Sequence, residues 1–397
     1  MSIETAVVLA AGEGARLRPL TKYRPKPMLP AANRPILEYV LDSLVEAGIE
    51  RIHLVVGYGG DRVKSHFGPY YRDHELTYHR QETQLGSGHA LLQVRDAVDE
   101  DFLVVNGDEV TADGMVRSVV DAHDHGRLAT LAVIESEEAR HYGAVRLHGT
   151  HVEEFTERPE DGDYRLLNAG IYAFGTDFFE YVDATPRESG ELGLPNAITW
   201  AMDRGETIHA VRTGGMRTEA TYPWDLTELA SVLLSTGLVA EPEQRDSVFV
   251  ADAASVHPTA TLRGPVAVAA DAVVGPGAVV GPDVAVGRNT TVEANATVRR
   301  SVLDVDTRIG AGSVVADSVT GRGAELSSGV AVPGGPGDVR IGTTVHERRP
   351  LGCVVSDRAV LGGGVTVAPG TLVGPDARVD HGVSLRGNVD ADAEVRR

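Results

Sequence analysis

The sequence predicts two architectures in one chain, an α/β domain with a mostly parallel sheet followed by an all-β parallel β-helix. Over residues 5–235, short apolar strands alternate with stretches of helical periodicity, which is typical of βα units. Beyond about residue 250 an aliphatic side chain recurs at every sixth position, a period that no helix keeps on one face. We expect the α/β domain over 1–237, a linker over 238–250 and the β-helix over 251–397.

The α/β half begins with a buried strand over Thr5–Ala10, which runs into glycines. Residues 36–47 have helical spacing, because Ile36, Val40, Leu44 and Ala47 share one face. Further strands are expected over 51–56, 102–106 and 128–134. In such sheets ligands bind beyond the carboxyl ends of the strands, so the first glycine loop is a candidate site.

The β-helix is predicted from hexapeptide repeats. The repeated aliphatic positions are Val256, Leu262, Val268, Val274, Val280, Val286, Val292 and Val298, and after a one-residue slip Leu303, Ile309 and Val315. The pattern breaks across roughly 320–350 and resumes from Val355 to Leu385. Three short sides per coil, each with one inward aliphatic residue, explain this period.

The composition is strongly acidic. The formal charge is −20, and only three lysines occur, Lys22, Lys26 and Lys64. Such a chain is a poor candidate for binding nucleic acid or anionic membranes. The pattern suggests adaptation to high salt, which screens self-repulsion, although a codon preference for arginine produces the same shortage of lysine.

The chain shows no sign of an oxidising compartment or a membrane. One cysteine, Cys353, excludes an intramolecular disulfide and a cysteine-cluster metal site. No basic region precedes the first apolar run, and no stretch of 18 apolar residues occurs. We therefore expect a cytoplasmic protein.

The glycine loop after the first strand indicates a phosphate site. The backbone of Ala10, Ala11, Gly12 and Gly14 can approach phosphate oxygens closely. Neither the dinucleotide fingerprint nor the P-loop fits, because both require other residues where Leu17 stands. Two cations follow, Arg16 in the loop and Lys26, which Pro25 and Pro27 hold in a restricted backbone.

With these motifs the chain resembles the nucleoside-diphosphate-sugar pyrophosphorylases over about residues 1–235. The matching segments are the glycine loop, Arg24–Pro30 (RPKPMLP), Gln84–Ala90 (QLGSGHA), Asn106–Asp108 (NGD), Tyr142–Val145 (YGAV), Glu157–Pro159 (ERP), Leu167–Tyr172 (LNAGIY) and Tyr222–Leu226 (YPWDL). With its repeat tail, the whole chain is similar to archaeal sugar-1-phosphate nucleotidyltransferases and to the bifunctional UDP-N-acetylglucosamine pyrophosphorylase architecture. The resemblance implies a Rossmann-like nucleotidyltransferase domain and a left-handed prism.

The resemblance implies a reaction in which an NTP, UTP or dTTP, and a sugar 1-phosphate give an NDP-sugar and pyrophosphate. A phosphate oxygen attacks the α-phosphorus in line, and cations must bring the two anions together. Arg16, Lys26 and Asp108 are then the catalytic residues. Asp108 and Glu219 are expected to hold Mg²⁺, which prefers oxygen ligands.

Binding roles also follow from the resemblance. Gln81, Gly86 and Ser87 are expected at the pyrimidine base. Gly143, Glu157 and Asn168 are expected at the sugar hydroxyls, and Arg158 stands where the family usually has Lys at the sugar phosphate. Each position has a structural alternative: an exposed loop polar residue for Gln81, a helix N-cap for Ser87, a turn residue for Asp108, and strand-end or hairpin residues for the sugar group.

The sequence also departs from the family pattern. Arg217, Glu219 and Thr221 stand where the family usually has Trp, Asp and Gly. Glu219 keeps a carboxylate but adds one methylene. Its structural alternative is an exposed glutamate paired with Arg217 or Arg212.

The tail lacks the residues expected for acetyl transfer. Ala311 occupies the place of the histidine expected in bifunctional relatives, and no lysine follows Lys64. We expect a spacer or an oligomerising β-helix, and its resemblance to hexapeptide-repeat proteins implies a homotrimer. Three functional hypotheses stay open at this point: a nucleotidyltransferase, a bifunctional enzyme that also acetylates an amino sugar phosphate, and a non-catalytic regulatory homologue.

Overall fold

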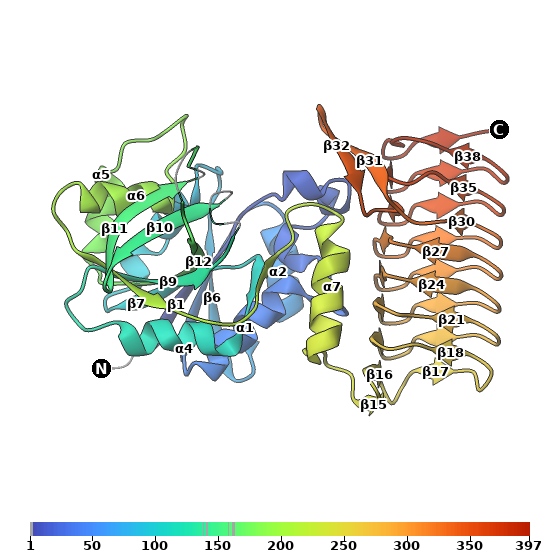
Figure 1. The fold of residues 1–397 in the computed structure, drawn as a ribbon, viewed down its shortest axis with the longest axis horizontal. Coiled ribbons are helices and arrows are strands. Elements are labelled where there is room, and N and C mark those ends of the chain that lie inside the picture. The colour runs from blue at the N-terminus through green and yellow to red at the C-terminus, as the bar shows by residue number, and fades with distance from the viewer. Residues whose placement is uncertain (1–2, 138, 140–141, 158, 161–162) are drawn as a thin grey trace. The chain divides into compact units, whose positions relative to one another are not determined.

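The computed structural model describes residues 3–137, 139, 142–157, 159–160 and 163–397 (Figure 1). Contacts divide the chain into two compact units. The first comprises residues 1–13, 25–28 and 36–218, and the second comprises 14–24, 29–35 and 219–397. In the described part of the chain, no helix has the length and apolar character needed to cross a bilayer.

The first unit is built on one ten-stranded sheet. Its order is β10 (Gly143–His148), β11 (His151–Glu157), β13 (Ile208–Arg212), β9 (Ala129–Glu135), β12 (Leu166–Phe174), β7 (Phe102–Asn106), β1 (Thr5–Ala10), β4 (Arg51–Val56), β6 (His74–Arg80) and β5 (Tyr70–Tyr71). The strands β7, β1, β4 and β6 are parallel, as is β9 with β13. The other pairs are antiparallel; β10 and β11, for example, are joined by a short turn that keeps them in one hairpin.

Helices cover both faces of this sheet. They are α1 (Ile36–Glu46), α2 (Gly60–Phe67), α3 (Ser87–Leu92), α4 (Asp113–Ala122), α5 (Phe178–Ala184) and α6 (Leu194–Met202). Because side chains alternate along a strand, Ala6 and Val8 of β1 pack with α1, α2 and α4, whereas Val7 and Leu9 pack with α3, α5 and α6. This confirms the predicted α/β architecture, and the predicted strands at 5–10, 51–56 and 102–106 have the expected bounds.

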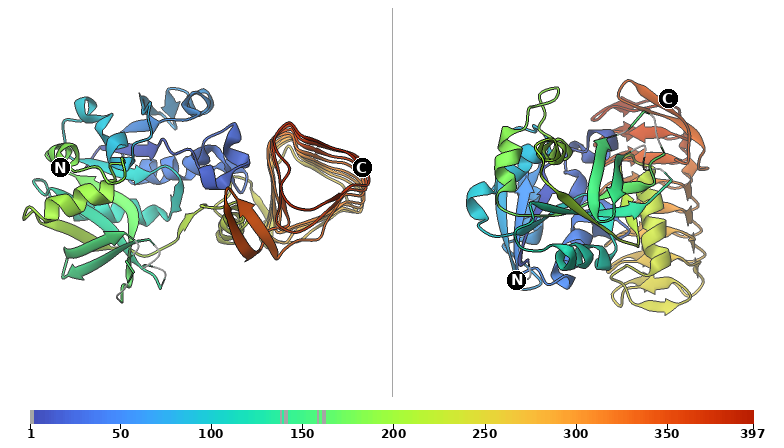
Figure 2. Two further views of the ribbon diagram at one scale, coloured as in Figure 1. Left: turned by 90° about the horizontal axis from the view of Figure 1, so that it is seen from above. Right: turned by 60° about the vertical axis from the view of Figure 1, so that its left-hand side comes forward.

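The second unit contains the β-helix, which appears as a three-sided prism when it is viewed along its axis (Figure 2). Its first side is β15 (Glu243–Arg245), β16 (Val248–Val250), β19 (Val266–Val268), β22 (Val284–Val286), β25 (Ser301–Leu303), β28 (Val319–Thr320), β33 (Cys353–Val355) and β36 (Thr371–Val373). Its second side is β17 (Ser255–Val256), β20 (Val273–Val274), β23 (Thr291–Val292), β26 (Arg308–Ile309), β29 (Glu325–Leu326), β34 (Val360–Leu361), β37 (Arg378–Val379) and β39 (Glu394–Val395). Its third side is β18 (Thr261–Leu262), β21 (Val279–Val280), β24 (Thr297–Arg299), β27 (Val314–Ala316), β30 (Ala331–Val332), β35 (Thr366–Val367) and β38 (Ser384–Leu385).

The repeated aliphatic side chains fill the interior of this prism, as their period predicts. The break in the repeat is shorter than expected, because Leu326 and Val332 continue the coil and a hairpin of β31 (Gly337–Ile341) and β32 (Thr344–Arg349) accounts for the rest. Strands β15 and β16 lie within the range predicted as linker. The domain boundaries stay a prediction.

The second unit also contains segments from the front half of the sequence. These are the helix α7 (Asp225–Thr236), the hairpin of β2 (Pro30–Ala31) and β3 (Arg34–Pro35), and the short 3₁₀ turns at Ala15–Leu17 and Leu20–Lys22. Two further 3₁₀ turns, Lys26–Met28 and Arg95–Ala97, belong to the first unit. Helix α7 contacts β25 and β22 of the prism, and Ser231 donates a hydrogen bond to Asp283 at 2.6 Å.

Candidate functional site

The predicted phosphate loop follows the central strand β1 at its carboxyl end. Ala10 and Ala11 are buried there, and two glycines from neighbouring strand ends pack against them. A Cβ atom on Gly57 would lie 2.7 Å from the Ala11 carbonyl oxygen, and one on Gly107 would lie 2.9 Å from the Ala10 Cβ. The strand ends around the loop approach one another so closely that only glycine fits at either position.

A glutamine side chain secures the start of this loop. Gln84 Nε2 donates a hydrogen bond of 2.7 Å to the Ala11 carbonyl oxygen, while Gly12 is exposed. Backbone N–H groups in an exposed glycine segment are available for anion oxygens. Gln84 opens one of the matching segments, but its residue type and position in the sequence predicted no role for it.

Two of the predicted catalytic residues form an ion pair in the first unit. Lys26 Nζ lies 2.7 Å from Asp108 Oδ2. The Lys26 side chain is 9% exposed and the Asp108 side chain 32%, so the lysine is enclosed while the carboxylate keeps access to solvent. Asp108 stands in the turn between β7 and β8 (Glu109–Thr111), at the sheet edge where ligands of such folds bind.

A buried ion pair beside Asp108 could not be predicted from the sequence, because its two residues are far apart in the chain. The Arg217 guanidinium binds the Glu109 carboxylate through Nε and Nη2, each at 3.0 Å, and both side chains are less than 10% exposed. Asn106 Nδ2 donates a further hydrogen bond of 2.9 Å to Glu109, and a Cβ atom on Gly170 would lie 2.8 Å from that carboxylate. Arg217, which departs from the family pattern, therefore has an acidic partner in Glu109. β8 pairs with β14 (Arg217–Glu219), so this ion pair joins the two strands.

The residues predicted at the pyrimidine base cluster around the start of α3. Gln81 is 4% exposed, so the alternative of an exposed loop residue is wrong; its Nε2 donates to the Gly86 carbonyl oxygen at 3.1 Å and lies 2.9 Å from His89 Nδ1. Gly86 has φ +98°, and a Cβ atom there would lie 2.4 Å from the Leu192 carbonyl oxygen.

Ser87 is the first residue of α3 and not its N-cap. Its hydroxyl accepts a hydrogen bond of 2.9 Å from the backbone N–H of Leu194, at the start of α6. This bond joins two helix starts, so the hydroxyl already has one structural partner.

The residues predicted at the sugar lie together on β10, β11 and β12. Gly143 is paired with Glu157 across the hairpin, and a Cβ atom on Gly143 would lie 2.8 Å from Glu157 Oε1 and 3.4 Å from the Asn168 Cβ. Asn168 is buried and donates to the Tyr172 hydroxyl at 2.6 Å. Arg158, the predicted contact to the sugar phosphate, lies outside the described residues.

Three predicted site residues belong to the second unit. Gly14 has φ +64° and precedes the 3₁₀ turn that carries the exposed Arg16. Glu219 is half-buried at the end of β14. Their place relative to Asp108 stays a prediction. Of the two arginines considered as partners of Glu219, Arg217 binds Glu109, and Arg212 lies 3.7 Å from Glu135.

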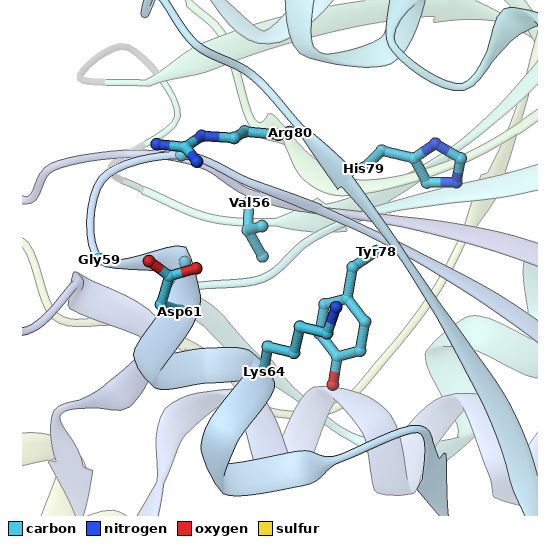
Figure 3. Close-up of a pocket in the computed structure, with 9 residues that line it drawn as sticks. Val56, Gly59, Asp61, Lys64, Tyr78, His79 and Arg80 are labelled. Carbon is cyan, nitrogen blue, oxygen red and sulfur yellow. The ribbon is translucent and has the colours of Figure 1, made fainter.

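A polar cavity of about 190 Å³ lies at the ends of β4 and β6 and the start of α2 (Figure 3). Its lining includes two cations, Lys64 and Arg80, and the Asp61 carboxylate. Lys64 Nζ lies 5.9 Å from the centre of the Tyr78 ring, and burial raises the pKa of Tyr78 to about 12. Gly57 connects the cavity wall with the phosphate loop, so the cavity borders the site without including its predicted catalytic residues.

Two family models match the chain. A model described as Nucleotidyl transferase matches residues 5–217, which is more than half of the chain. A model described as GMPPB C-terminal domain matches residues 262–389. The two matches fall on the sheet of the first unit and on the prism of the second.

Several curated proteins are similar to this chain. UTP–glucose-1-phosphate uridylyltransferase AglF of Haloferax volcanii is 36% identical over 228 residues, which cover 56% of this chain and 93% of that protein. Bifunctional protein GlmU of Methanococcus maripaludis C5 is 33% identical over 234 residues, and the chain spans about half the length of that relative, 54%. GlmU of the S2 strain is 28% identical over 408 residues, with 98% of this chain and 96% of that protein covered.

The fold has solved counterparts. A UDP-glucose pyrophosphorylase complexed with UDP-glucose superimposes with a TM-score of 0.54 at 24% identity, over 59% of this chain and 99% of that one. A UTP-bound UDP-glucose pyrophosphorylase from Acinetobacter baumannii gives a TM-score of 0.53, also at 24% identity, over 59% and 94%. These likenesses concern the fold of the sheet and its helices.

Proposed function

Because the chain belongs to the nucleotidyl transferase family, we propose that it is a sugar-1-phosphate nucleotidyltransferase that joins UTP or dTTP to a sugar 1-phosphate. The products are an NDP-sugar and pyrophosphate. The observation that carries the proposal is the ion pair of Lys26 and Asp108 at the carboxyl edge of the sheet, in the unit that also holds the start of the glycine loop. The activities by which two archaeal relatives are named, glucose-1-phosphate uridylyltransferase and bifunctional GlmU, support it.

In the proposed reaction an oxygen of the sugar phosphate forms a bond to the α-phosphorus of the nucleotide. The bond from the α-phosphorus to the bridging oxygen breaks, and pyrophosphate leaves with that electron pair. Lys26 supplies positive charge where the two anions meet, and Arg16 is proposed to do the same from the loop. Because Lys26 is enclosed, its ammonium group is held in place before substrate arrives, which lowers the cost of ordering it.

We propose Mg²⁺ as the metal, held by Asp108 and Glu219 together with phosphate oxygens. Among the described residues, no group of three or more His, Cys, Asp or Glu side chains gathers as a ready metal cage. One or two carboxylates with substrate oxygens suit Mg²⁺, and the partly exposed Asp108 carboxylate fits this role. When bound, the metal would neutralise phosphate charge.

The remaining assignments concern recognition. Gln81, Gly86 and Ser87 are proposed to face the base, and burial of the Gln81 amide supports a defined hydrogen-bonding edge. Gly143, Glu157 and Asn168 are proposed to face the sugar, with Arg158 at its phosphate. Because Gly143 has no Cβ, the Glu157 carboxylate and the Asn168 side chain can both lie close to its backbone, which places two polar groups side by side for sugar hydroxyls.

The test is pyrophosphate release by the full chain, with UTP, dTTP and GTP against several sugar 1-phosphates. Lys26→Met and Asp108→Asn are expected to lower kcat by on the order of 10²-fold or more, since each removes charge that acts on the phosphates. Lys64→Met and Asp121→Asn are matched controls for the same chemical changes. No turnover by the wild type with any pair would contradict the proposal and favour a regulatory homologue.

A bifunctional enzyme is the second candidate, because similarity to the bifunctional GlmU extends over 98% of the chain. Acyl transfer to an amine needs a general base near that amine. Ala311, at the expected histidine position, offers none, and its backbone N–H donates to Glu293 at 2.9 Å. We therefore expect no consumption of acetyl-CoA with glucosamine 1-phosphate, and turnover that disappears on deletion of 251–397 would reverse this assignment.

We further propose a cytoplasmic homotrimer assembled through residues 251–397 and adapted to high salt. The hexapeptide prism supports the assembly, and the charge of −20 supports the salt requirement, since unscreened carboxylates repel one another. Light scattering in molar salt is expected to report three copies, with weaker association in dilute buffer. A monomer in molar salt would contradict the trimer.

A further inference from the structure

Arg24 is a buried charge in the same short motif as Lys26, and the proposed mechanism does not use it. Its Nη2 lies 2.5 Å from Asp304 Oδ2 and 3.0 Å from Asp357 Oδ1. Its side chain is 11% exposed, and both carboxylates are 6% exposed. Arg24 and the two aspartates belong to the second unit, so a residue of the front half of the sequence is bound by the β-helix.

The β-helix holds these two carboxylates in a fixed position. Asp304 follows β25 and Asp357 follows β33, with β28 between the two strands. In the intervening coil stands Gly321, where a Cβ atom would lie 2.3 Å from Asp357 Oδ1. The glycine therefore makes room for the Asp357 side chain at the corner of the prism.

Backbone groups of the prism orient both acceptors. The N–H of Val305 donates to Asp304 Oδ1 at 2.7 Å, and the N–H of Arg322 donates to Asp357 Oδ1 at 3.1 Å. Burial by itself lowers the pKa of Arg24, but Asp304 and Asp357 outweigh it, and the pKa is raised. Two buried carboxylates and one buried guanidinium thus form a buried ionic cluster.

Further contacts hold the chain on both sides of residues 25–28. Before them, the Arg358 guanidinium lies 5.1 Å from the centre of the Tyr23 ring, and Lys22 Nζ lies 3.6 Å from Asp392. After them, Asn33 Nδ2 donates to Glu241 Oε1 at 2.8 Å. Residues on both sides of 25–28 are therefore held within the second unit.

We propose that Arg24 is a positioning residue. The Asp304 and Asp357 carboxylates of the β-helix bind its guanidinium, and the prism thereby sets the position of the backbone that carries Lys26. This inference rests on the proposed function of Lys26. Only Pro25 separates Arg24 from Lys26, and the ring of proline restricts the backbone between them. Displacement of a catalytic group by about 1 Å costs on the order of 10²-fold in rate, so loss of the anchor should slow turnover without removing any group that touches substrate.

The first experiment measures hydrogen exchange in the full chain without substrate. The double variant D304N/D357N is expected to exchange faster at the amides of residues 20–31 than the wild type. Glu293→Gln is the matched control, because its carboxylate also binds an arginine, Arg308, but on the prism itself. Unchanged exchange at 20–31 in the double variant would overturn the inference, and this result is independent of whether the wild type turns over any sugar 1-phosphate.

The second experiment separates positioning from stability. D304N/D357N leaves Arg24 buried without a counter-charge and is expected to be less stable, whereas the triple variant R24M/D304N/D357N removes all three charges and should regain much of that stability. For positioning, we expect the triple variant to keep a kcat at least 10-fold below that of the wild type, with a KM for the nucleotide changed less than 3-fold. Recovery of full kcat together with stability would show a merely structural role and overturn the inference. Absence of wild-type turnover would contradict the proposed function alone, and the exchange result would still decide the anchoring.

Discussion

The buried pair of Glu109 and Arg217 should make Arg217 one of the positions in the first unit at which a substitution is most destabilising. Arg217→Met keeps the length of the side chain but removes the guanidinium that binds both carboxylate oxygens at 3.0 Å. Asn106 then remains as a hydrogen-bond donor at 2.9 Å, and it carries no charge. Glu109, whose side chain is 8% exposed, would then have lost the guanidinium of Arg217.

The magnitude follows from the burial of the pair. Removal of one partner from a buried ion pair costs about 3–5 kcal/mol, because the other charge stays desolvated. The double variant E109Q/R217M removes both charges and should cost about 2 kcal/mol less than R217M, within the range of coupling energies of contacting residues. Arg217→Trp, which restores the residue usual in the family, is expected to be as destabilising as R217M because Glu109 is retained.

Urea unfolding followed by circular dichroism measures these differences, with Arg212→Met as the matched control. Arg212 Nη1 lies 3.7 Å from Glu135 Oε1, and both side chains are more than 60% exposed, so its loss should cost no more than about 1 kcal/mol. If R217M is no more destabilising than R212M, or if the double variant is less stable than R217M, the account of this pair is wrong.

Three further predictions concern single residues. Burial lowers the pKa of His53 to about 4, below its ordinary value of 6.5. The contribution of His53 to the free energy of unfolding should therefore be constant above pH 6.5 and fall as the pH drops towards 4. Urea titrations at several pH values should show a smaller slope over this range in His53→Gln than in the wild type, and an unchanged slope would contradict the prediction. Gly86→Ala should be clearly less stable than the control Gly126→Ala in thermal melts, because both have positive φ but only at Gly86 would the new Cβ meet the Leu192 carbonyl oxygen. Glu219→Gln should lose most activity in a Mg²⁺ titration while Glu219→Asp keeps it, since an amide is a weaker Mg²⁺ ligand than a carboxylate. If wild type and Glu219→Gln reach half-maximal activity at the same Mg²⁺ concentration, Glu219 is not a metal ligand.

Much of the architecture could be predicted from local patterns. The six-residue period identified the β-helix because each of these aliphatic side chains must point into the prism. Every coil needs such side chains at the same positions, so the pattern repeats along the sequence. The strand over Thr5–Ala10 was evident because all six residues are buried in the centre of a sheet. The motif around Lys26 and the turn at Asp108 were predicted as site residues from chemistry that short segments carry by themselves.

The partners of these residues could not be predicted, because they are far apart in the sequence. Lys26 binds Asp108, Glu109 binds Arg217, and Arg24 binds aspartates about 280 and 330 positions away. The sequence does not distinguish an arginine that binds a phosphate from one that binds a buried carboxylate, because the acceptor that lies within 3 Å is determined only in the folded chain. The sequence therefore determined the two architectures and the candidate chemistry, whereas the tertiary structure decided which charges are paired, because pairing depends on burial and on distances that long-range packing creates.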